Sequence, residues 1–139
     1  MSNADLIRTG YEGFARGDVQ PVIDILDENA EWYEAENVPY WSGGPYVGPQ
    51  NILENAVAFT RVPLLFKDFR VDVRRIVDAG DTVIMEGRYR ASNAYGTDSP
   101  LDAQVVHVWD FRDGKVIRFQ QYIDTWQMVE VTGVTPVPA

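Results

Sequence analysis

The single histidine of this 139-residue chain, His107, is the first side chain that could carry out acid–base chemistry. It lies in an alternating run over residues 101–111 that leads into an Asp113-Gly114 turn. Because successive side chains of a strand point to opposite faces, this run assigns each of its polar groups to one side of a sheet. An imidazole there can exchange a proton near neutral pH, or it can be a neutral, hydrogen-bonded core residue.

The returning strand over residues 116–126 carries three polar side chains at a spacing of two, Gln120, Tyr122 and Asp124. With a turn of two or four residues, His107 lies opposite Gln120, and all of these groups share one face. We therefore expect a wet pocket in which Asp124, His107 and Tyr122 are the catalytic side chains. A three-residue turn would instead reverse the relation between the two strands.

A second candidate carboxyl is Glu34, in a short alternating strand over residues 30–36 that also carries Trp32. Burial in a pocket would raise the pKa of Asp124 and make it a usable base near neutral pH. Glu34 and Asp124 each also have an ordinary interpretation, with Glu34 as one of several solvated acidic side chains and Asp124 as an exposed strand end or an ion partner of Arg118 or Lys115.

The substrate-binding wall is expected to be aromatic and apolar, although the same residues could be plain core. The candidates are Trp32, Trp109, Tyr89, Phe59, Met85, Trp41, Tyr46 and Gln120. Trp41 and Tyr46 belong to a Gly- and Pro-rich loop over residues 37–48, and loops of this length often cover functional sites.

Length and composition limit the possible classes of protein. With 45% hydrophobic residues, we expect one domain over residues 1–130 and a loosely ordered tail over residues 131–139. The absence of cysteine and the single histidine exclude thiolate chemistry and disfavour a catalytic zinc site, so neither metal nor cofactor is expected. A net charge of −9 argues against nucleic acid and anionic membranes as partners. No apolar run is long enough to span a membrane and no signal peptide is evident, which makes the cytoplasm the expected location.

The order of the segments predicts an α+β domain in which three N-terminal helices pack on a curved, mostly antiparallel sheet. Helices are expected over residues 2–16, 18–26 and 49–61, and strands over residues 30–36, 69–76, 82–91, 101–111 and 116–126. A phase change near Arg74-Arg75 indicates a β-bulge.

The outer, convex face of this sheet is expected to carry Ile117, Phe119 and Ile123. These side chains are too apolar for water, so the sequence predicts a homodimer that buries this face.

The segment order resembles that of the SnoaL-like proteins of the nuclear-transport-factor-2-like superfamily, over residues 4–127. The similar features are the Gly17-Asp18 link between two helices, the run over residues 28–32, the loop over residues 45–48, and the closing hairpin through residues 107–124. The resemblance implies a single SnoaL-like domain, folded as a conical α+β barrel with a deep pocket and usually dimeric.

The resemblance also implies roles for individual residues. In SnoaL-type polyketide cyclases an aspartate on the last strand is the acid–base group and matches Asp124, while a histidine on the preceding strand matches His107. In ketosteroid isomerases the base matches Glu34. The tyrosine of the oxyanion hole in those isomerases would fall at Gly10, and Tyr11 lies about 100° further round the helix.

Together these features predict a cofactor-independent acid–base enzyme of the isomerase, cyclase or dehydratase type, acting on a small apolar carbonyl compound. Asp124 or Glu34 would remove a proton next to the carbonyl, and a hydrogen bond from His107 or Tyr122 would stabilise the enolate oxygen. The alternatives are a non-catalytic module that binds a small hydrophobic molecule and a structural dimerisation domain.

Overall fold

The structure, a computed structural model, describes residues 1–136. Its helices are α1 (Asn3–Ala15), α2 (Gln20–Asp24), α3 (Pro49–Asn55), α4 (Val57–Thr60), α5 (Val62–Leu65) and α6 (Thr125–Thr132). Its strands are β1 (Leu26–Tyr33), β2 (Tyr46–Val47), β3 (Phe66–Lys67), β4 (Arg70–Asp78), β5 (Thr82–Ala94), β6 (Ser99–Arg112) and β7 (Lys115–Ile123).

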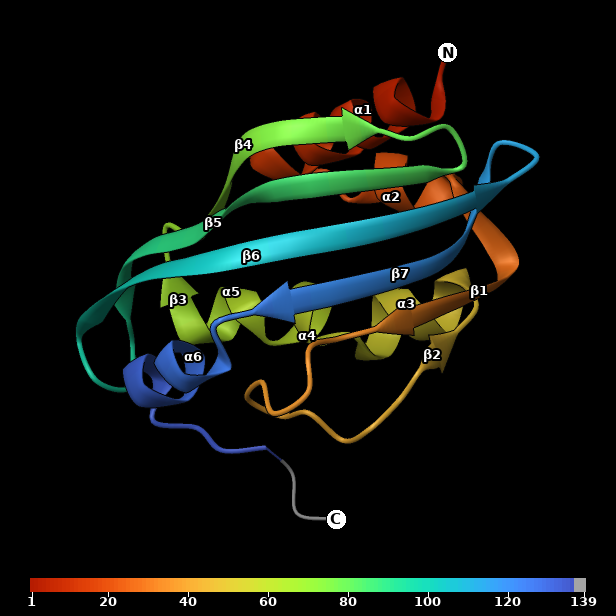
Figure 1. Cartoon of the computed structure of the whole chain (residues 1–139). Helices are drawn as coiled ribbons and strands as arrows, with labels where there is room; N and C mark the ends of the chain where they lie inside the picture. The colour runs from red at the N-terminus through yellow and green to blue at the C-terminus, as the bar shows by residue number, and fades with distance from the viewer. Residues whose placement is uncertain (137–139) are drawn as a thin grey trace.

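The strands form one curved sheet in the order β2-β1-β7-β6-β5-β3, and β4 also pairs with β5. Strands β1 and β7 run parallel, while the other paired strands run antiparallel. In Figure 1, α1 and α2 lie behind the upper edge of the sheet, and α3, α4 and α5 lie behind its lower edge. This arrangement confirms the predicted α+β class. The sheet curves without closing, so the barrel expected from the resemblance is an open one.

The first helix is fixed at its start by a capping box. The Ser2 hydroxyl accepts a hydrogen bond from the Asp5 N–H at 3.1 Å, and the Asp5 carboxylate accepts one from the Ser2 N–H. Two of the N–H groups that a helix start leaves unpaired are thereby satisfied. Further along, Gly10 allows α2 to approach closely, because a Cβ at this position would lie 3.2 Å from the Val22 side chain.

The final hairpin decides which side chains of β7 face the helices. Next to the turn, Phe111 pairs with Val116, which is the register that a two-residue turn gives. One step later, Asp110 pairs with Arg118 and leaves Ile117 as the extra residue of a β-bulge. The bulge shifts the register by one residue along the rest of the hairpin.

Beyond the bulge, His107 pairs with Gln121 rather than with Gln120, so the predicted register is wrong there. A shift of one residue turns every later side chain to the opposite face. Phe119 is consequently buried in the core at 2% exposure, and Ile123 packs on the second core cluster. The predicted placement of these two side chains on the convex face is therefore also wrong.

The end of β7 differs from the prediction as well. The strand ends at Ile123, where the sequence predicted it to continue to residue 126. Asp124 stops it, because its side chain accepts a hydrogen bond from the Gln127 N–H at 3.1 Å and caps α6. Val131 and Thr132 are buried in that helix, so the packed chain extends beyond the predicted boundary at residue 130. Residues 137–139 of the predicted tail lie outside the described residues.

The predicted third helix is divided into three short ones, α3, α4 and α5. The first break is at Ala56, whose φ of −63° and ψ of 136° are those of an extended residue. The predicted bulge in β4 is confirmed, since the register shifts between Val73 and Arg75. Among the described residues, no helix is long and apolar enough to cross a bilayer.

Candidate functional site

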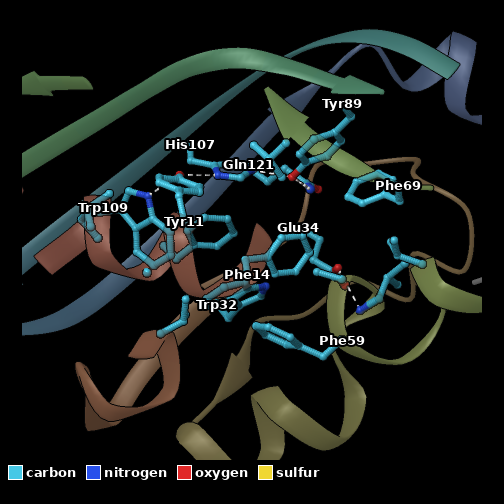
Figure 2. Close-up of a pocket in the computed structure, with 18 of the residues that line it drawn as sticks. Tyr11, Phe14, Trp32, Glu34, Phe59, Phe69, Tyr89, His107, Trp109 and Gln121 are labelled. Carbon is cyan, nitrogen blue, oxygen red and sulfur yellow. Dashed lines mark hydrogen bonds between the residues drawn. The ribbon is translucent and has the colours of Figure 1, made fainter. Parts of the chain in front are cut away.

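A cavity lies between α1, the α4–α5 segment and the inner face of the sheet (Figure 2). Aromatic and aliphatic side chains form most of its wall. Polar groups are contributed by Tyr11, Glu34, Tyr89, His107 and Gln121. The space open to the centre of a water-sized sphere is about 60 Å³. One water molecule needs about 10–15 Å³ by that measure, so the cavity has room for several waters or a small organic molecule.

His107 is the centre of a hydrogen-bond chain on the inner face of the sheet (Figure 2). Its Nδ1 lies 2.7 Å from the Tyr11 hydroxyl oxygen, and its Nε2 lies 2.5 Å from that of Tyr89. At the two ends, the Trp109 indole N–H donates to Tyr11 at 2.9 Å and the Gln121 amide donates to Tyr89 at 2.8 Å. These side chains come from α1, β5, β6 and β7, so the hydrogen-bond chain depends on the register of the final hairpin.

Burial keeps this hydrogen-bond chain uncharged. His107 is 5% exposed, and burial lowers its pKa to about 3. Burial also raises the pKa of Tyr11 and of Tyr89 above their ordinary values, since desolvation disfavours the charged form of each group. At neutral pH the side chains of this hydrogen-bond chain are therefore all uncharged donors and acceptors.

Glu34 places a carboxyl group in the same cavity. It directly follows β1, it is 7% exposed, and burial raises its pKa to about 7. Its Oε2 accepts a hydrogen bond from the Val57 N–H at 3.0 Å, at the start of α4. Its Oε1 is buried without a partner among the described residues. Because Oε2 is held by the backbone, Oε1 is the oxygen that is free to take up or release a proton.

The indole of Trp32 supplies a second unpaired polar atom. It stacks on Phe119 with the ring centroids 3.8 Å apart, and its Nε1–H is buried without a partner within residues 1–136. A buried polar group without a partner costs free energy. The unpaired atoms of Trp32 and Glu34 therefore favour a bound molecule that carries polar atoms of its own.

The structure brings together six of the residues that the sequence predicted for the site. The cavity is lined by His107, Glu34, Trp32, Trp109, Tyr89 and Phe59. They come from β1, β5, β6 and the α4–α5 segment, so residues far apart in the sequence converge as the predicted pocket requires.

Three predicted residues of the last strand do not join this site. The bulge at Ile117 turns Gln120 and Tyr122 to the outer face, where Tyr122 is 57% exposed. Asp124 is exposed and caps α6. The predicted shared face for Asp124, Tyr122 and His107 is therefore wrong, and Glu34 is the predicted carboxyl that lies beside the histidine network.

Three predicted wall residues also lie elsewhere. Met85 points inward but is fully buried in the second core cluster, behind the surface of the cavity. Tyr46 belongs to β2, where it pairs with Trp32 at the edge of the sheet. Trp41 is half-buried in the loop before β2 and does not line the cavity. The same loop nevertheless contributes the buried Val38 to the cavity wall.

Sequence reasoning missed several residues of the site. Tyr11, Phe14, Phe69, Phe119 and Gln121 all line the cavity. Tyr11 and Phe14 were visible as part of the apolar stripe of the first helix, at a spacing of three. Gln121 had no comparable signal, because its direction depends on the bulge.

The arrangement of the cavity suits proton transfer within an apolar molecule. Neutral hydrogen-bond donors lie on one part of the cavity wall, and a carboxyl with a pKa near neutrality lies on another part. Such a pair can bind an oxygen atom while moving a proton at a nearby atom. Within residues 1–136, no three His, Asp or Glu side chains gather as ligands for a metal ion.

Comparison with known proteins gives one family and several similar folds. A model of the SnoaL-like domain matches residues 7–119, and no curated protein matches the chain. An NTF2-like protein of Burkholderia thailandensis superposes with a TM-score of 0.83 at 25% identity, over 94% of this chain and 97% of that one. An NTF2-like protein of unknown function from Burkholderia pseudomallei superposes with a TM-score of 0.79 at 27% identity, over 95% and 98%. TerC, co-crystallised with polyporic acid, superposes with a TM-score of 0.77 at 25% identity, over 94% and 98%.

Proposed function

Because the chain belongs to the SnoaL-like domain family, whose fold serves polyketide cyclases and isomerases, we propose that it is a cofactor-independent acid–base enzyme. Its substrate is a small, mostly apolar carbonyl compound. The observation that carries this proposal is the unpaired Glu34 Oε1 in an aromatic cavity beside the Tyr11–His107–Tyr89 chain. Glu34 also matches the position of the base in ketosteroid isomerases. Asp124, which matches the aspartate of the cyclases, lies outside the cavity.

In the proposed reaction, Glu34 is the base. Its Oε1 takes a proton from the carbon next to the substrate carbonyl. The electron pair of that C–H bond becomes the C=C bond of the enolate, and the π pair of the carbonyl moves onto the carbonyl oxygen. A phenol hydroxyl of Tyr11 or Tyr89 donates a hydrogen bond to this enolate oxygen. Return of the proton from Glu34 to the far carbon of a conjugated enolate re-forms the carbonyl and gives an isomer. Attack of the enolate carbon on a second carbonyl of the same molecule, whose oxygen then takes the proton, gives a ring. Loss of a hydroxyl group from the next carbon, which leaves as water with the proton from Glu34, gives an alkene.

The surroundings of Glu34 support its role as a base. A carboxyl with a pKa of about 7 is ionised in half of the molecules at that pH, and it is a far stronger base than an exposed carboxylate. The aromatic wall keeps water away, which strengthens the hydrogen bond to the developing charge. The backbone bond to Oε2 fixes the carboxyl, so Oε1 faces the cavity without rotating away.

Deuterium exchange at the carbon next to a carbonyl tests this proposal. We expect the protein to catalyse exchange of the α-hydrogens of α-tetralone in D₂O, followed by proton NMR. Glu34→Gln keeps the Oε2 bond but removes the base, and should lower the rate by about 10²–10⁴-fold. Asp124→Asn is the matched control and should exchange at the parent rate. Equal rates for the parent and Glu34→Gln would contradict the role of Glu34.

The rival is a non-catalytic module that binds a small hydrophobic molecule in the same cavity. Binding of α-tetralone raises the melting temperature in either case, since a ligand of the native state stabilises it. Binding without α-hydrogen exchange, in the parent as in Glu34→Gln, would favour this rival.

We also propose that two copies of the chain pair through the outer face of the sheet. Ile84, Val106 and Val108 alternate with inward residues of β5 and β6, and they are only half-buried in one chain. An apolar strip on a central part of a sheet favours association. Sedimentation velocity should give a dimer for the parent and a monomer for Val108→Glu. A monomeric parent at high concentration contradicts the pairing.

A further inference from the structure

The hydrogens available to the hydrogen-bond chain from Tyr11 through His107 to Tyr89 can be counted, because the donor of the hydrogen bond at each end is known. An indole N–H can only donate, so the Tyr11 oxygen accepts from Trp109. The oxygen of the Gln121 amide accepts a hydrogen bond from the Ala35 N–H at 3.1 Å. The amide nitrogen of Gln121 therefore faces Tyr89 and donates to it.

The middle of the chain contains one imidazole between two phenols. A neutral imidazole carries a hydrogen on one nitrogen and a lone pair on the other. Of the two bonds at His107, one is therefore donated by the histidine and the other by a tyrosine. The burial of His107, which lowers its pKa to about 3, keeps the ring in this neutral form.

This count leaves one phenol hydrogen unused. With the ring hydrogen on Nε2, His107 donates to Tyr89, Tyr11 donates to Nδ1, and the Tyr89 hydroxyl hydrogen has no acceptor within the chain. With the ring hydrogen on Nδ1, the Tyr11 hydroxyl hydrogen is the one left over. Both phenols line the cavity, so the spare hydrogen is available to a molecule bound there.

We propose that His107 is a positioning residue whose tautomer selects which of the two phenols, Tyr11 or Tyr89, donates a hydrogen bond to the bound molecule. This inference rests on the proposed function only where it assigns that hydrogen bond to a carbonyl oxygen. The two phenols bond to opposite sides of the His107 ring. The cavity wall therefore has two possible donor positions, and only one of the two phenols has a free hydroxyl hydrogen in each tautomer. The donor moves between them without any charge on His107.

The arrangement also limits what can bind. The phenol that donates its hydrogen to His107 has only lone pairs left. A ligand carbonyl oxygen beside this phenol therefore finds no hydrogen-bond donor. The wall therefore accepts a ligand with one acceptor oxygen at this place and disfavours a second one beside the other phenol. A ligand of the same shape without an oxygen has no reason to prefer either tautomer.

The single histidine makes the tautomer directly measurable. In protein labelled with ¹⁵N-histidine, the two ring nitrogens of His107 give the only imidazole signals, and their shifts separate a protonated nitrogen from an unprotonated one. Circular dichroism and thermal unfolding first establish that each variant is folded.

Two matched variants should move the tautomer in opposite directions. A buried N–H without an acceptor is less tolerated than an unpaired lone pair. Tyr11→Phe should therefore place the hydrogen on Nε2, facing the remaining Tyr89, and Tyr89→Phe should place it on Nδ1, facing Tyr11. We expect the tautomer ratio to differ by about tenfold or more between the two variants. The same tautomer in both, or a doubly protonated ring in the parent near neutral pH, overturns the proposal.

A ligand titration of the parent protein gives a second test that needs no substitution. Saturation with α-tetralone should shift the two ring nitrogens in opposite directions, while tetralin, which has the same shape without the carbonyl, should leave their ratio unchanged. Equal shifts for both compounds count against the proposal. If the tautomers respond as expected but no α-hydrogen exchange occurs, the proposed enzyme function fails and the role of His107 stands. If α-hydrogen exchange occurs but the tautomer of His107 stays fixed, the enzyme function stands and the proposed role of His107 fails.

Discussion

Two carboxyl groups follow the ends of neighbouring parallel strands, and they have opposite surroundings. Glu34 follows β1 and is buried in the cavity, with a pKa raised to about 7. Asp124 follows β7, is exposed, and accepts the Gln127 N–H at the start of α6. The two strands pair directly, since Tyr33 lies opposite Gln120.

The difference shows that the direction of a side chain, more than its chemistry, decides what it can do. A carboxyl that faces the cavity loses its water and becomes a base for neutral pH. A similar carboxyl that faces solvent becomes a helix cap. A single extra residue, Ile117 in the β-bulge, reverses the faces of β7 and so separates Asp124 from the cavity.

Replacing Glu34 with glutamine should have the largest effect on how stability depends on pH. The carboxyl has an ordinary pKa of 4.5 and a folded-state pKa of about 7. Between these values the unfolded chain has lost a proton that the folded chain keeps, so this group makes the parent less stable as the pH rises. The stability of Glu34→Gln relative to the parent should therefore increase by about 3 kcal/mol across this window, measured by urea unfolding.

His107 is an internal control for that measurement. Its pKa falls from 6.5 to about 3 on folding, so its contribution to stability is lost as the pH falls through that range. The contribution is the same in the parent and in Glu34→Gln and cancels in the difference. A difference that does not change with pH would show that Glu34 titrates in the folded protein as it does in the unfolded chain.

The rate of α-hydrogen exchange should depend on pH in the direction that a base requires. Because only ionised Glu34 accepts a proton, the rate should rise about tenfold per pH unit up to about 7 and level off above it. Asp124→Asn should leave this profile unmoved. A parent profile without a rise near neutrality would break the contrast between the two carboxyls.

Removing the exposed carboxyl should have a smaller effect, on stability alone. Asp124→Ala removes the cap of α6 and should lower the free energy of unfolding by about 1 kcal/mol, measured by urea unfolding. Asp124→Ser is the control, because a hydroxyl can also accept the Gln127 N–H and should restore most of the loss. If Asp124→Ala also slows exchange strongly while the fold is intact, the aspartate has a role in the site.

A third carboxyl, on the outer face, should have the smallest effect. Glu86 pairs with Arg74 at 3.0 Å and with Arg75 at 3.1 Å, and both arginines are well exposed. Exposed ion pairs contribute little in water, so Glu86→Gln should change stability by less than about 1 kcal/mol, and less still in high salt. A larger, salt-independent loss in denaturant unfolding would show that this face is not simply solvated.

The sequence was sufficient for the fold and for about half of the site. Segment order and periodicity predicted the α+β class, the first helix and the bulge near Arg74, because these depend on local patterns. The alternating run predicted His107, and the resemblance to ketosteroid isomerases pointed to Glu34. The bulge at Ile117 has no such local signal, since the run Val116-Ile117 looks like ordinary strand.

The missed residues have a common cause. Gln121 and Phe119 face the cavity because of the register, and register depends on how two strands fit together over the core. Tyr11 was placed one step away from the tyrosine position of related isomerases. Its hydroxyl nevertheless lies 2.7 Å from His107 Nδ1.

The bond between Glu34 and α4 links the proposed chemistry to the cavity wall. The carboxylate holds the Val57 N–H, and α4 and α5 together supply Val57, Phe59 and Val62 to that wall. A neutral carboxyl accepts a hydrogen bond more weakly than a charged one, so uptake of a proton by Glu34 loosens the start of α4. In the proposed reaction, the bond from the Val57 N–H to Glu34 is therefore strong while the carboxylate is ionised, and weaker once the carboxyl carries the proton. Molecules should enter and leave the cavity faster on the acid side of neutrality than on the alkaline side.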